Sequence, residues 1–358
     1  MYKRRYSMPM LLPVICLLAQ ACAIQATNVA AAPPVAQAEL LVKLPDWCNT
    51  PDGMALLPDG SFILSVPNFN ELSAGSFLAR VTADNKVEKF MDLPKHPVTN
   101  EPMGPLGVCV GPLGNLYLAD YQMTGERQSR VVKIEMNNGK PGKIIPVITG
   151  FRVSNAVAYR DGHLYVSETQ IDIEATPATS GVFRFSMKEL AQGPIKLAED
   201  VTKDQHFLDI VTCHDKELPL GADGLCFDKK GNLYIGNFAD GTVHQFQFDA
   251  QGKVASNKVF ARAAFMKSAD GLVFDPVTNV IYVADSRANA IQVVALDGTV
   301  TTLAKNGDTD GLDGGMDQPC EPLLRGREVI VSNMDWPVPG CVNQTYNTPA
   351  TLSVIKLD

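Results

Sequence analysis

The sequence predicts an all-β fold, a six-bladed β-propeller with about four strands in each blade. A phrase made of an apolar strand, a turn with glycine or aspartate, and a second strand ending in Asp, Asn or Glu occurs six times. The copies begin about 50 residues apart, and further apolar strands follow most of them. Repeated four-stranded units of this kind are typical of propellers.

Each of the six copies corresponds to one blade, and the blades follow one another in chain order. Each supplies the two strands expected nearest the axis of one blade, and the segments after it supply the outer strands. The copies read PDGMALLPDGSFILSVPN at 51–68, PLGVCVGPLGNLYLAD at 105–120, SNAVAYRDGHLYVSE at 154–168, ADGLCFDKKGNLYIGN at 222–237, ADGLVFDPVTNVIYVAD at 269–285 and QPCEPLLRGREVIVSN at 318–333.

A small residue marks the start of each of the first five copies. The one long interval between markers predicts an insertion at 186–222. Segments 39–44 and 351–357 are expected to close the ring, and no boundary divides 39–358, which predicts one propeller domain. The markers are Gly53, Gly107, Ala156, Gly224 and Gly271.

Residues 1–38 are predicted to be a signal peptide followed by a flexible leader. Lys3, Arg4 and Arg5 precede a short apolar stretch at 8–18, which is too short to span a membrane. Cleavage is expected after Ala21 or near residue 38, and the alternative is a lipid anchor at Cys22. We therefore expect an exported protein, periplasmic or secreted, without a membrane span.

The net charge limits the classes of binding partner, and the cysteines indicate which disulfides are expected. The net charge of −8 without a basic cluster beyond the N-terminus argues against nucleic acid and favours cations or neutral small molecules. Export permits disulfides, and Cys320 and Cys341 in the last copy are the favoured pair. Cys109 and Cys226 are expected to be buried thiols, and no cysteine or histidine spacing indicates zinc.

The residue before each marker is expected to lie where the innermost strand begins, beside the central channel. Several carboxylates would then converge there and repel one another unless protonated or neutralised, and Ca²⁺ or another divalent cation is the natural counter-ion. The alternative is that each Asp-Gly is only a strand-entry turn. These residues are Asp52, Leu106, Asn155, Asp223, Asp270 and, in the sixth copy, Glu321 or Cys320.

With its acid in blade one, SNA in blade three and ADGL in blade four, the chain resembles the senescence-marker-protein/gluconolactonase (regucalcin-like) family of propellers over nearly the whole of 39–358. The resemblance implies a divalent metal, usually Ca²⁺, held by Asp52, Asn155 and Asp223, and we add Glu321 as a further candidate ligand. Two departures stand out, because Asp52 replaces the usual Glu and Leu106 replaces a frequent Asn. Phrases at 283–294 and 311–319 also look like NHL-type propeller repeats.

The resemblance implies hydrolysis of a lactone or related ester, with the metal polarising the carbonyl. Asp223 is the first candidate to activate water and Asp270 the second. The residues that end the second strands return to the same face and are candidates to contact substrate or support the metal ligands, as is His214 as a proton shuttle. They are Asn68, Asp120, Glu168, Asn237, Asp285 and Asn333.

Two other functions stay open at this point. One is a non-enzymatic propeller that binds a ligand or partner and keeps Ca²⁺ for structure, which Leu106 and the NHL-like phrases favour. The other is hydrolysis of a phosphotriester. The insertion at 186–222 and the loop at 307–317 are expected to overhang the channel, and in that loop Asp308, Asp310 and Asp313 have a spacing that suits a separate Ca²⁺ or a solvated turn.

Overall fold

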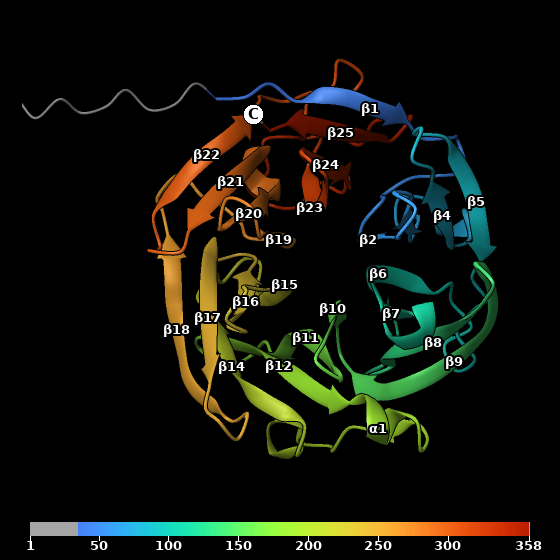
Figure 1. The fold of residues 1–358 in the computed structure, drawn as a ribbon, viewed down its shortest axis with the longest axis vertical. Coiled ribbons are helices and arrows are strands. Elements are labelled where there is room, and N and C mark those ends of the chain that lie inside the picture. The colour runs from blue at the N-terminus through green and yellow to red at the C-terminus, as the bar shows by residue number, and fades with distance from the viewer. Residues whose placement is uncertain (1–34, 358) are drawn as a thin grey trace, which may run out of the picture. The chain divides into compact units, whose positions relative to one another are not determined.

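The structure, a computed structural model, describes residues 35–357. Nearly every regular element in this range is a β-strand, and the strands form six sheets around a central channel (Figure 1). The predicted all-β, six-bladed propeller is therefore confirmed. The predicted signal peptide and the alternative lipid anchor at Cys22 fall on residues outside the described range.

Each blade is a sheet whose first strand lies nearest the channel and whose last strand lies at the rim. Blades one to three contain β2 (Met54–Leu56), β3 (Phe62–Val66), β4 (Phe77–Val81) and β5 (Val87–Asp92); β6 (Gly104–Val110), β7 (Leu116–Tyr121), β8 (Ser129–Asn137), β9 (Lys140–Phe151) and the short β13 (Ile195–Lys196); and β10 (Ser154–Arg160), β11 (His163–Asp172), β12 (Ala178–Ser186) and β14 (Phe207–Cys213). Blades four to six contain β15 (Ala222–Phe227), β16 (Leu233–Asn237), β17 (Thr242–Phe248) and β18 (Val254–Arg262); β19 (Leu272–Asp275), β20 (Val280–Asp285), β21 (Ala290–Ala295) and β22 (Val300–Lys305); and β23 (Pro319–Arg325), β24 (Glu328–Asn333), β25 (Thr351–Lys356) and β1 (Glu39–Lys43).

Local sequence explains the hairpins, and blade four shows how. The turn between β15 and β16 is held by Asp228, whose Oδ1 accepts the backbone N–H groups of Lys230 (2.8 Å) and Asn232 (2.9 Å). Gly231 takes a left-handed conformation with φ +86°, which glycine adopts at no steric cost. The two strands then pair in antiparallel register, with Cys226 opposite Tyr234.

The ring is closed by the two ends of the described chain. β1 pairs with β25 in the sheet of blade six, and the blue and red strands lie side by side in Figure 1. The ring closure expected from 39–44 and 351–357 is therefore confirmed.

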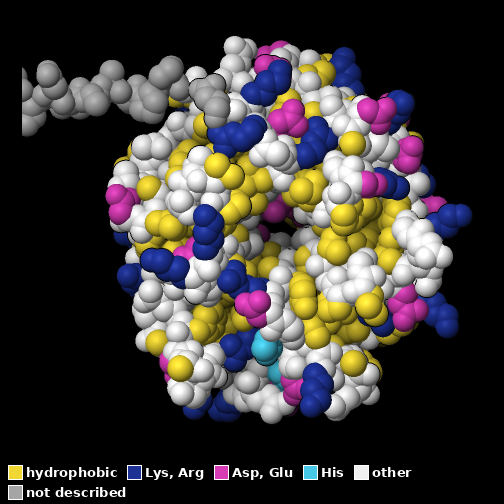
Figure 2. All heavy atoms as spheres, viewed as in Figure 1, with side chains coloured by type: hydrophobic (Ala, Val, Ile, Leu, Met, Phe, Trp, Pro, Cys, Tyr) yellow, Lys and Arg dark blue, Asp and Glu magenta, His cyan; other side chains and the backbone are white. Residues whose placement is uncertain are grey.

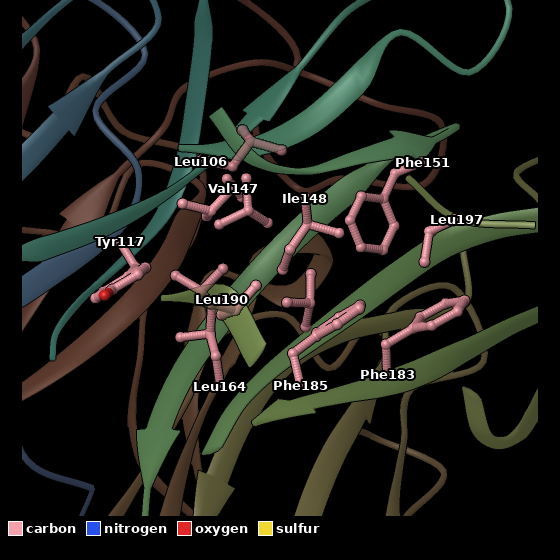
Figure 3. Packing of buried hydrophobic residues seen from close by; sticks show 14 of the residues in the cluster. Leu106, Tyr117, Val147, Ile148, Phe151, Leu164, Phe183, Phe185, Leu190 and Leu197 are labelled. Carbon is pink, nitrogen blue, oxygen red and sulfur yellow. The ribbon is translucent and has the colours of Figure 1, made fainter. Parts of the chain in front are cut away.

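Hydrophobic cores lie between adjacent blades. The cluster drawn in Figure 3 joins Val147, Ile148 and Phe151 of β9 to Phe183 and Phe185 of β12, so that it fills the wedge between blades two and three. Phe151 and Phe183 meet edge to face with ring centroids 5.4 Å apart. Such contacts fix each blade against its neighbour.

The insertion at 186–222 contributes mostly to the rim. After the short helix α1 (Met187–Leu190), β13 adds in parallel to β9 of blade two, and β14 forms the outer strand of blade three. Only the segment between β14 and β15 approaches the channel. No helix within residues 35–357 is long and apolar enough to cross a membrane.

The predicted disulfide between Cys320 and Cys341 is wrong, because all six cysteines of the described residues are free. The thiol of Cys320, on the innermost strand of blade six, contacts Pro51 O of blade one at 3.3 Å. Cys341 lies in the loop after β24, where its sulfur accepts from Gln318 Nε2 at 3.5 Å. The two thiols therefore have different neighbours. Cys226 is buried as expected, and Cys109 is half-buried.

Candidate functional site

The marker glycines are explained by contact between neighbouring blades. A Cβ atom on Gly53 would lie 2.6 Å from Leu106 O, and one on Gly224 would lie 2.5 Å from Asp270 O. The innermost strands thus meet backbone to backbone, and no side chain fits between them. The residue before each glycine lies at the same level of the ring, beside the channel.

Blade six follows the same frame with a different residue at the marker. Gly271 donates its backbone N–H to Cys320 O at 2.8 Å, and a Cβ on Gly271 would lie 2.6 Å from that oxygen. Cys320 therefore occupies the position before the marker, and Glu321 occupies the marker position itself. The Glu321 carboxylate lies against Gly271, where a side chain would strike Oε2.

A cavity of about 100 Å³ opens at the channel mouth. Figure 2 shows a hollow at the centre of the ring, bordered by hydrophobic side chains with acidic ones at its wall. The cavity is lined by Asp52, Phe69, Leu106, Tyr121, Val153, Asn155, Thr169, Leu220, Asp223, Phe238, Asp270, Gln318, Met334, Trp336 and Val338.

The structure brings together most of the candidate ligands and catalytic groups. Asp52, Asn155, Asp223 and Asp270 come from four different blades and all line this cavity. Glu321 is not part of the lining, but burial and the charges of Asp52 and Asp270 raise its pKa well above its usual range. The group therefore holds four carboxyls and one amide.

Burial and mutual repulsion raise the pKa of these carboxyls. The pKa of Asp223 lies well above its usual range, because burial and the charges of Asp52 and Glu321 disfavour ionisation. Burial, with the charges of Asp223 and Asp52, does the same to Asp270. Burial raises the pKa of Asp52 to about 7, although a hydrogen bond from Cys320 opposes the shift. Carboxyl pKa values that are raised in this way cluster at functional sites of proteins.

Direct hydrogen bonds orient two of these carboxyls. Ser286 Oγ lies 2.7 Å from Asp270 Oδ2 and 2.6 Å from Pro319 O, so its single hydroxyl proton bonds one of these two oxygens at a time. Asp270 in turn hydrogen-bonds Asp223. Asp223 and Asp270 thus form a coupled pair that is anchored to blade six.

The donor set suits a hard divalent cation. Among residues 35–357 no lysine or arginine forms an ion pair with the channel carboxyls, although their charges act on one another. Carboxylate and amide oxygens are the ligands that Ca²⁺ prefers. In the described part of the chain no three acidic, histidine or cysteine side chains already converge as a complete ligand set. The group therefore fits a cation in chemistry, and Asp52, Asn155 and Asp223 are the residues that would hold it.

The residues that end the second strands do not line the cavity. In blades one, two, three and five their side chains accept from the backbone that leads into the innermost strand of the same blade, whereas in blade four the side chain bonds the outer strand of blade three. Asn68 accepts from Asn49 N (2.8 Å), Asp120 from Gly104 N (3.0 Å), Glu168 from Arg152 N (2.7 Å) and Val153 N (2.6 Å), and Asp285 from Ser268 N (2.8 Å), while Asn237 donates to Thr212 O (2.8 Å) and Asn333, in blade six, donates to Thr351 Oγ1 (3.0 Å).

The cavity wall is built instead by the next residue along the chain, because successive side chains of a strand point in opposite directions. Sequence reasoning missed these residues, although their fixed place after the polar strand end was a usable signal. They are Phe69, Tyr121, Thr169, Phe238 and Met334, with Ser286 in the same place on Asp270.

His214 is separate from the cavity. Its side chain is exposed and its Nδ1 lies 2.8 Å from Asp240 Oδ2, outside the lining described above. From the insertion at 186–222 the lining includes Leu220, and no residue of the loop at 307–317 belongs to it. The expected overhang is thus limited to the end of the insertion.

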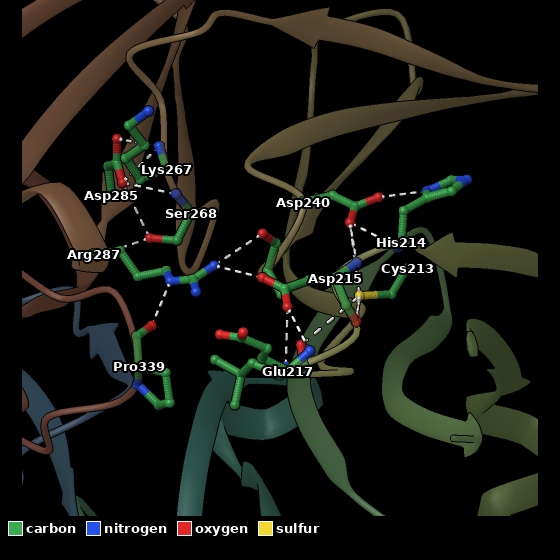
Figure 4. A network of polar contacts seen from close by, with 12 residues as sticks. Cys213, His214, Asp215, Glu217, Asp240, Lys267, Ser268, Asp285, Arg287 and Pro339 are labelled. Carbon is green, nitrogen blue, oxygen red and sulfur yellow. Dashed lines mark hydrogen bonds and ion pairs between the residues drawn. The ribbon is translucent and has the colours of Figure 1, made fainter. Parts of the chain in front are cut away.

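A polar network holds the loops around this mouth (Figure 4). Arg287 Nη1 lies 3.0 Å from Asp215 Oδ2, and its Nε donates to Pro339 O at 2.9 Å. Asp240 Oδ1 accepts the backbone N–H of His214 at 2.8 Å. Arg287 therefore connects blade five to the loop before blade four and to the loop that carries Trp336 and Val338.

Comparison with known proteins supports the architecture. No protein-family profile and no curated protein matches the chain. Among solved structures, a gluconolactonase from Xanthomonas campestris shares 14% identity and a TM-score of 0.57 over 92% of this chain and 99% of that one. Regucalcin, a calcium-binding protein from Agrobacterium tumefaciens, shares 14% and 0.58 over 92% and 97%.

A third structure of the same fold comes from a protein with a different name and activity. The aldose sugar dehydrogenase from Streptomyces coelicolor, solved in its PQQ-bound form, shares 14% identity and a TM-score of 0.55 over 91% of this chain and 99% of that one. At these identities the likeness establishes the fold and leaves the chemistry to be argued from the channel. The chain is thus a six-bladed propeller of the architecture that gluconolactonase and regucalcin share.

Proposed function

We propose that the protein is an exported, metal-dependent hydrolase of a lactone or related ester. One observation carries the proposal: Asp52, Asn155, Asp223 and Asp270 meet in a single cavity with an otherwise largely apolar lining. Export rests on the basic and apolar N-terminal sequence, and the N-terminal residue of the mature protein checks it.

Asp52, Asn155 and Asp223 would hold a divalent cation, and Glu321 is a further candidate ligand. When bound, such a cation supplies Lewis-acid polarisation of an ester carbonyl and stabilises the developing oxyanion. The remaining wall is largely apolar, with the rings of Phe69 and Trp336 in contact at a centroid distance of 5.0 Å and tilted by 37°. These rings pack against the apolar part of a substrate and exclude bulk water.

Asp223 and Asp270 are positioned to take the proton of an attacking water. Ser286 holds Asp270 in place, and Asp270 contacts Asp223, so that a proton accepted by one carboxyl is shared by the pair. Addition of water to the acyl carbon and cleavage of its bond to the ring oxygen would yield a hydroxy acid. The same groups could return the proton to the leaving alkoxide.

The volume of the cavity limits the size of the substrate group that can enter it. About 100 Å³ is well below the roughly 300–1,000 Å³ of pockets for drug-sized ligands. We therefore propose a small ring or short acyl group as the part that enters the channel.

A second function is favoured by Leu106. It places an apolar side chain in the lining between the blades of Asp52 and Asn155, so the ligand set is interrupted there. This arrangement suits a propeller that binds a small molecule or partner and keeps the cation for structure.

The test is the metal content of the purified mature protein, with hydrolysis of a panel of lactones and esters before and after chelation. In Asp223→Asn we expect activity to fall by at least about 100-fold, the usual contribution of a general base. Asp161→Asn is the matched control, because Asp161 is exposed in a hairpin and its φ of 46° suits Asn.

Metal that is bound without turnover of any substrate would favour the binding function over the hydrolase. A metal-free protein whose activity survives chelation would refute the metal-dependent mechanism.

A further inference from the structure

Two further acidic residues lie next to the channel cavity, at the end of blade six where β23 begins and β24 ends. Asp317 is two residues before β23 and Asp335 is two residues after β24, and the two strands pair with Pro319 opposite Asn333. The antiparallel register therefore brings the two carboxyls together. They lie within hydrogen-bonding distance of each other.

Both side chains are almost completely buried. Asp317 is 4% exposed and Asp335 is 1% exposed. The Oδ1 atom of each has no hydrogen-bond partner among the described residues, whereas Asp335 Oδ2 accepts the backbone N–H of Asn347. Buried carboxylate oxygens without a donor cost considerable free energy unless a cation or a proton neutralises them.

The surroundings of the pair are acidic rather than basic. The charges of Asp308 and Asp310 both act on Asp317, and both residues are exposed at the surface. No ion pair within residues 35–357 involves any of the four carboxylates. Burial and these neighbours raise the pKa of Asp317 to about 8 and that of Asp335 to about 6.

From this geometry we propose that Asp317 and Asp335 form a second divalent-cation site, distinct from the channel, which takes Ca²⁺ through the exposed Asp308 and Asp310. Oxygen donors and a high count of negative charge are the features that such sites use. Backbone carbonyls of the 307–317 loop and water would complete the coordination.

The site would set one wall of the channel cavity. Gln318 follows Asp317, and Trp336 follows Asp335, and both line the cavity. Gln318 and Asp335 have left-handed backbones, with φ of 54° and 46°. Conformations of this kind persist where the surroundings enforce them. A cation between the two loops would hold Trp336 in place without touching a substrate.

The experiment measures Ca²⁺ binding to the full mature chain by equilibrium dialysis and by the shift of the thermal midpoint. The double variant Asp52→Ala/Asp223→Ala serves as the background, because alanine supplies no oxygen ligand at either channel position. We expect one equivalent of Ca²⁺ in this background and none after Asp317→Asn is added. Asp297→Asn is the matched control, because Asp297 is exposed in a hairpin of blade five, where it accepts the backbone N–H of Thr299 (2.9 Å), and belongs to neither candidate cation site.

The double variant Asp308→Asn/Asp310→Asn keeps the test decisive if Asp317→Asn fails to fold, because both residues are exposed. It should weaken Ca²⁺ binding by about tenfold, since affinity follows ligand charge. Unchanged stoichiometry and midpoint in both variants would overturn the site. So would the absence of Ca²⁺ binding in the Asp52→Ala/Asp223→Ala background, which would leave a carboxyl pair that shares a proton.

Discussion

In blades two and three, two adjacent residues at the end of the second strand have opposite tasks. In blade three, Glu168 accepts the backbone N–H groups of Arg152 and Val153, while Thr169, one residue later, lines the cavity. In blade two, Asp120 and Tyr121 repeat the arrangement. The polar residue thus fixes the chain that enters the innermost strand, and its neighbour faces the ligand.

Glu168 predicts a dependence of stability on pH. Burial raises its pKa from 4.5 to about 7 although backbone hydrogen bonds oppose the shift. The folded state therefore binds a proton that the unfolded chain releases between these values. The contribution of Glu168 to the free energy of unfolding is full below pH 4.5, falls as pH rises to 7, and changes by at most about 3 kcal/mol.

Urea unfolding of the wild type and Glu168→Gln between about pH 5 and 8 measures this difference. The stability gap should narrow as pH rises, because glutamine does not titrate. Glu174→Gln, at an exposed position in the same blade, is the control. Parallel pH profiles for the wild type and Glu168→Gln would contradict the assignment.

At the scale of elements, the innermost strands pack through their glycines. Gly53 meets Leu106 and Gly107, and Gly224 meets Asp270 and Gly271, backbone to backbone. Serine hydroxyls of the second strands add hydrogen bonds to the next blade, such as Ser65 Oγ to Leu106 O at 2.7 Å. The spacing of the ligands around the channel is therefore set by main-chain contacts.

Gly224→Ala tests this packing. The added Cβ would lie 2.5 Å from Asp270 O and 2.6 Å from Gly271 Cα, so the two strands must separate. We expect a loss of about 1–3 kcal/mol, as for other overpacked interiors, measured by chemical unfolding. Gly307→Ala is the matched control, since nothing lies within 4 Å of its added atom. Equal stability of the two variants would show that the strands are not in close contact.

At the scale of the whole molecule, the ring depends on β1. Its pairing with β25 completes the sheet of blade six, and the backbone N–H of Leu44 donates to Ala350 O at 2.8 Å just after it. Leu44 is buried in the core between blades six and one. Without this strand, β25 would become an unprotected edge.

Comparison of residues 35–358 with residues 45–358 measures the contribution of the closing strand. The shorter chain should melt at least about 10 °C lower, because it loses the pairing of β1 and the burial of Leu44. It should also aggregate through the exposed β25. A shared midpoint would show that β1 is dispensable.

The sequence predicted the channel residues whose positions are fixed by the repeat. It missed the residues of the site that lie on loops outside the repeat. The position before each marker located Asp52, Asn155, Asp223 and Asp270, because the same backbone frame recurs in every blade. Trp336 and Leu220 lie on loops that follow no repeat. The outer strand β14 was hidden in the insertion, since 20 residues separate β12 from it and break the hairpin pattern.

The main-chain contact between innermost strands also has an evolutionary meaning. Because main-chain contacts at the marker positions set the spacing of the blades, the side chain before each marker takes no part in that contact. Leu106 is an apolar member of a series that otherwise includes Asp52, Asn155, Asp223 and Asp270. One inherited scaffold can in this way exchange its ligands one blade at a time, so new chemistry requires few substitutions and no new fold.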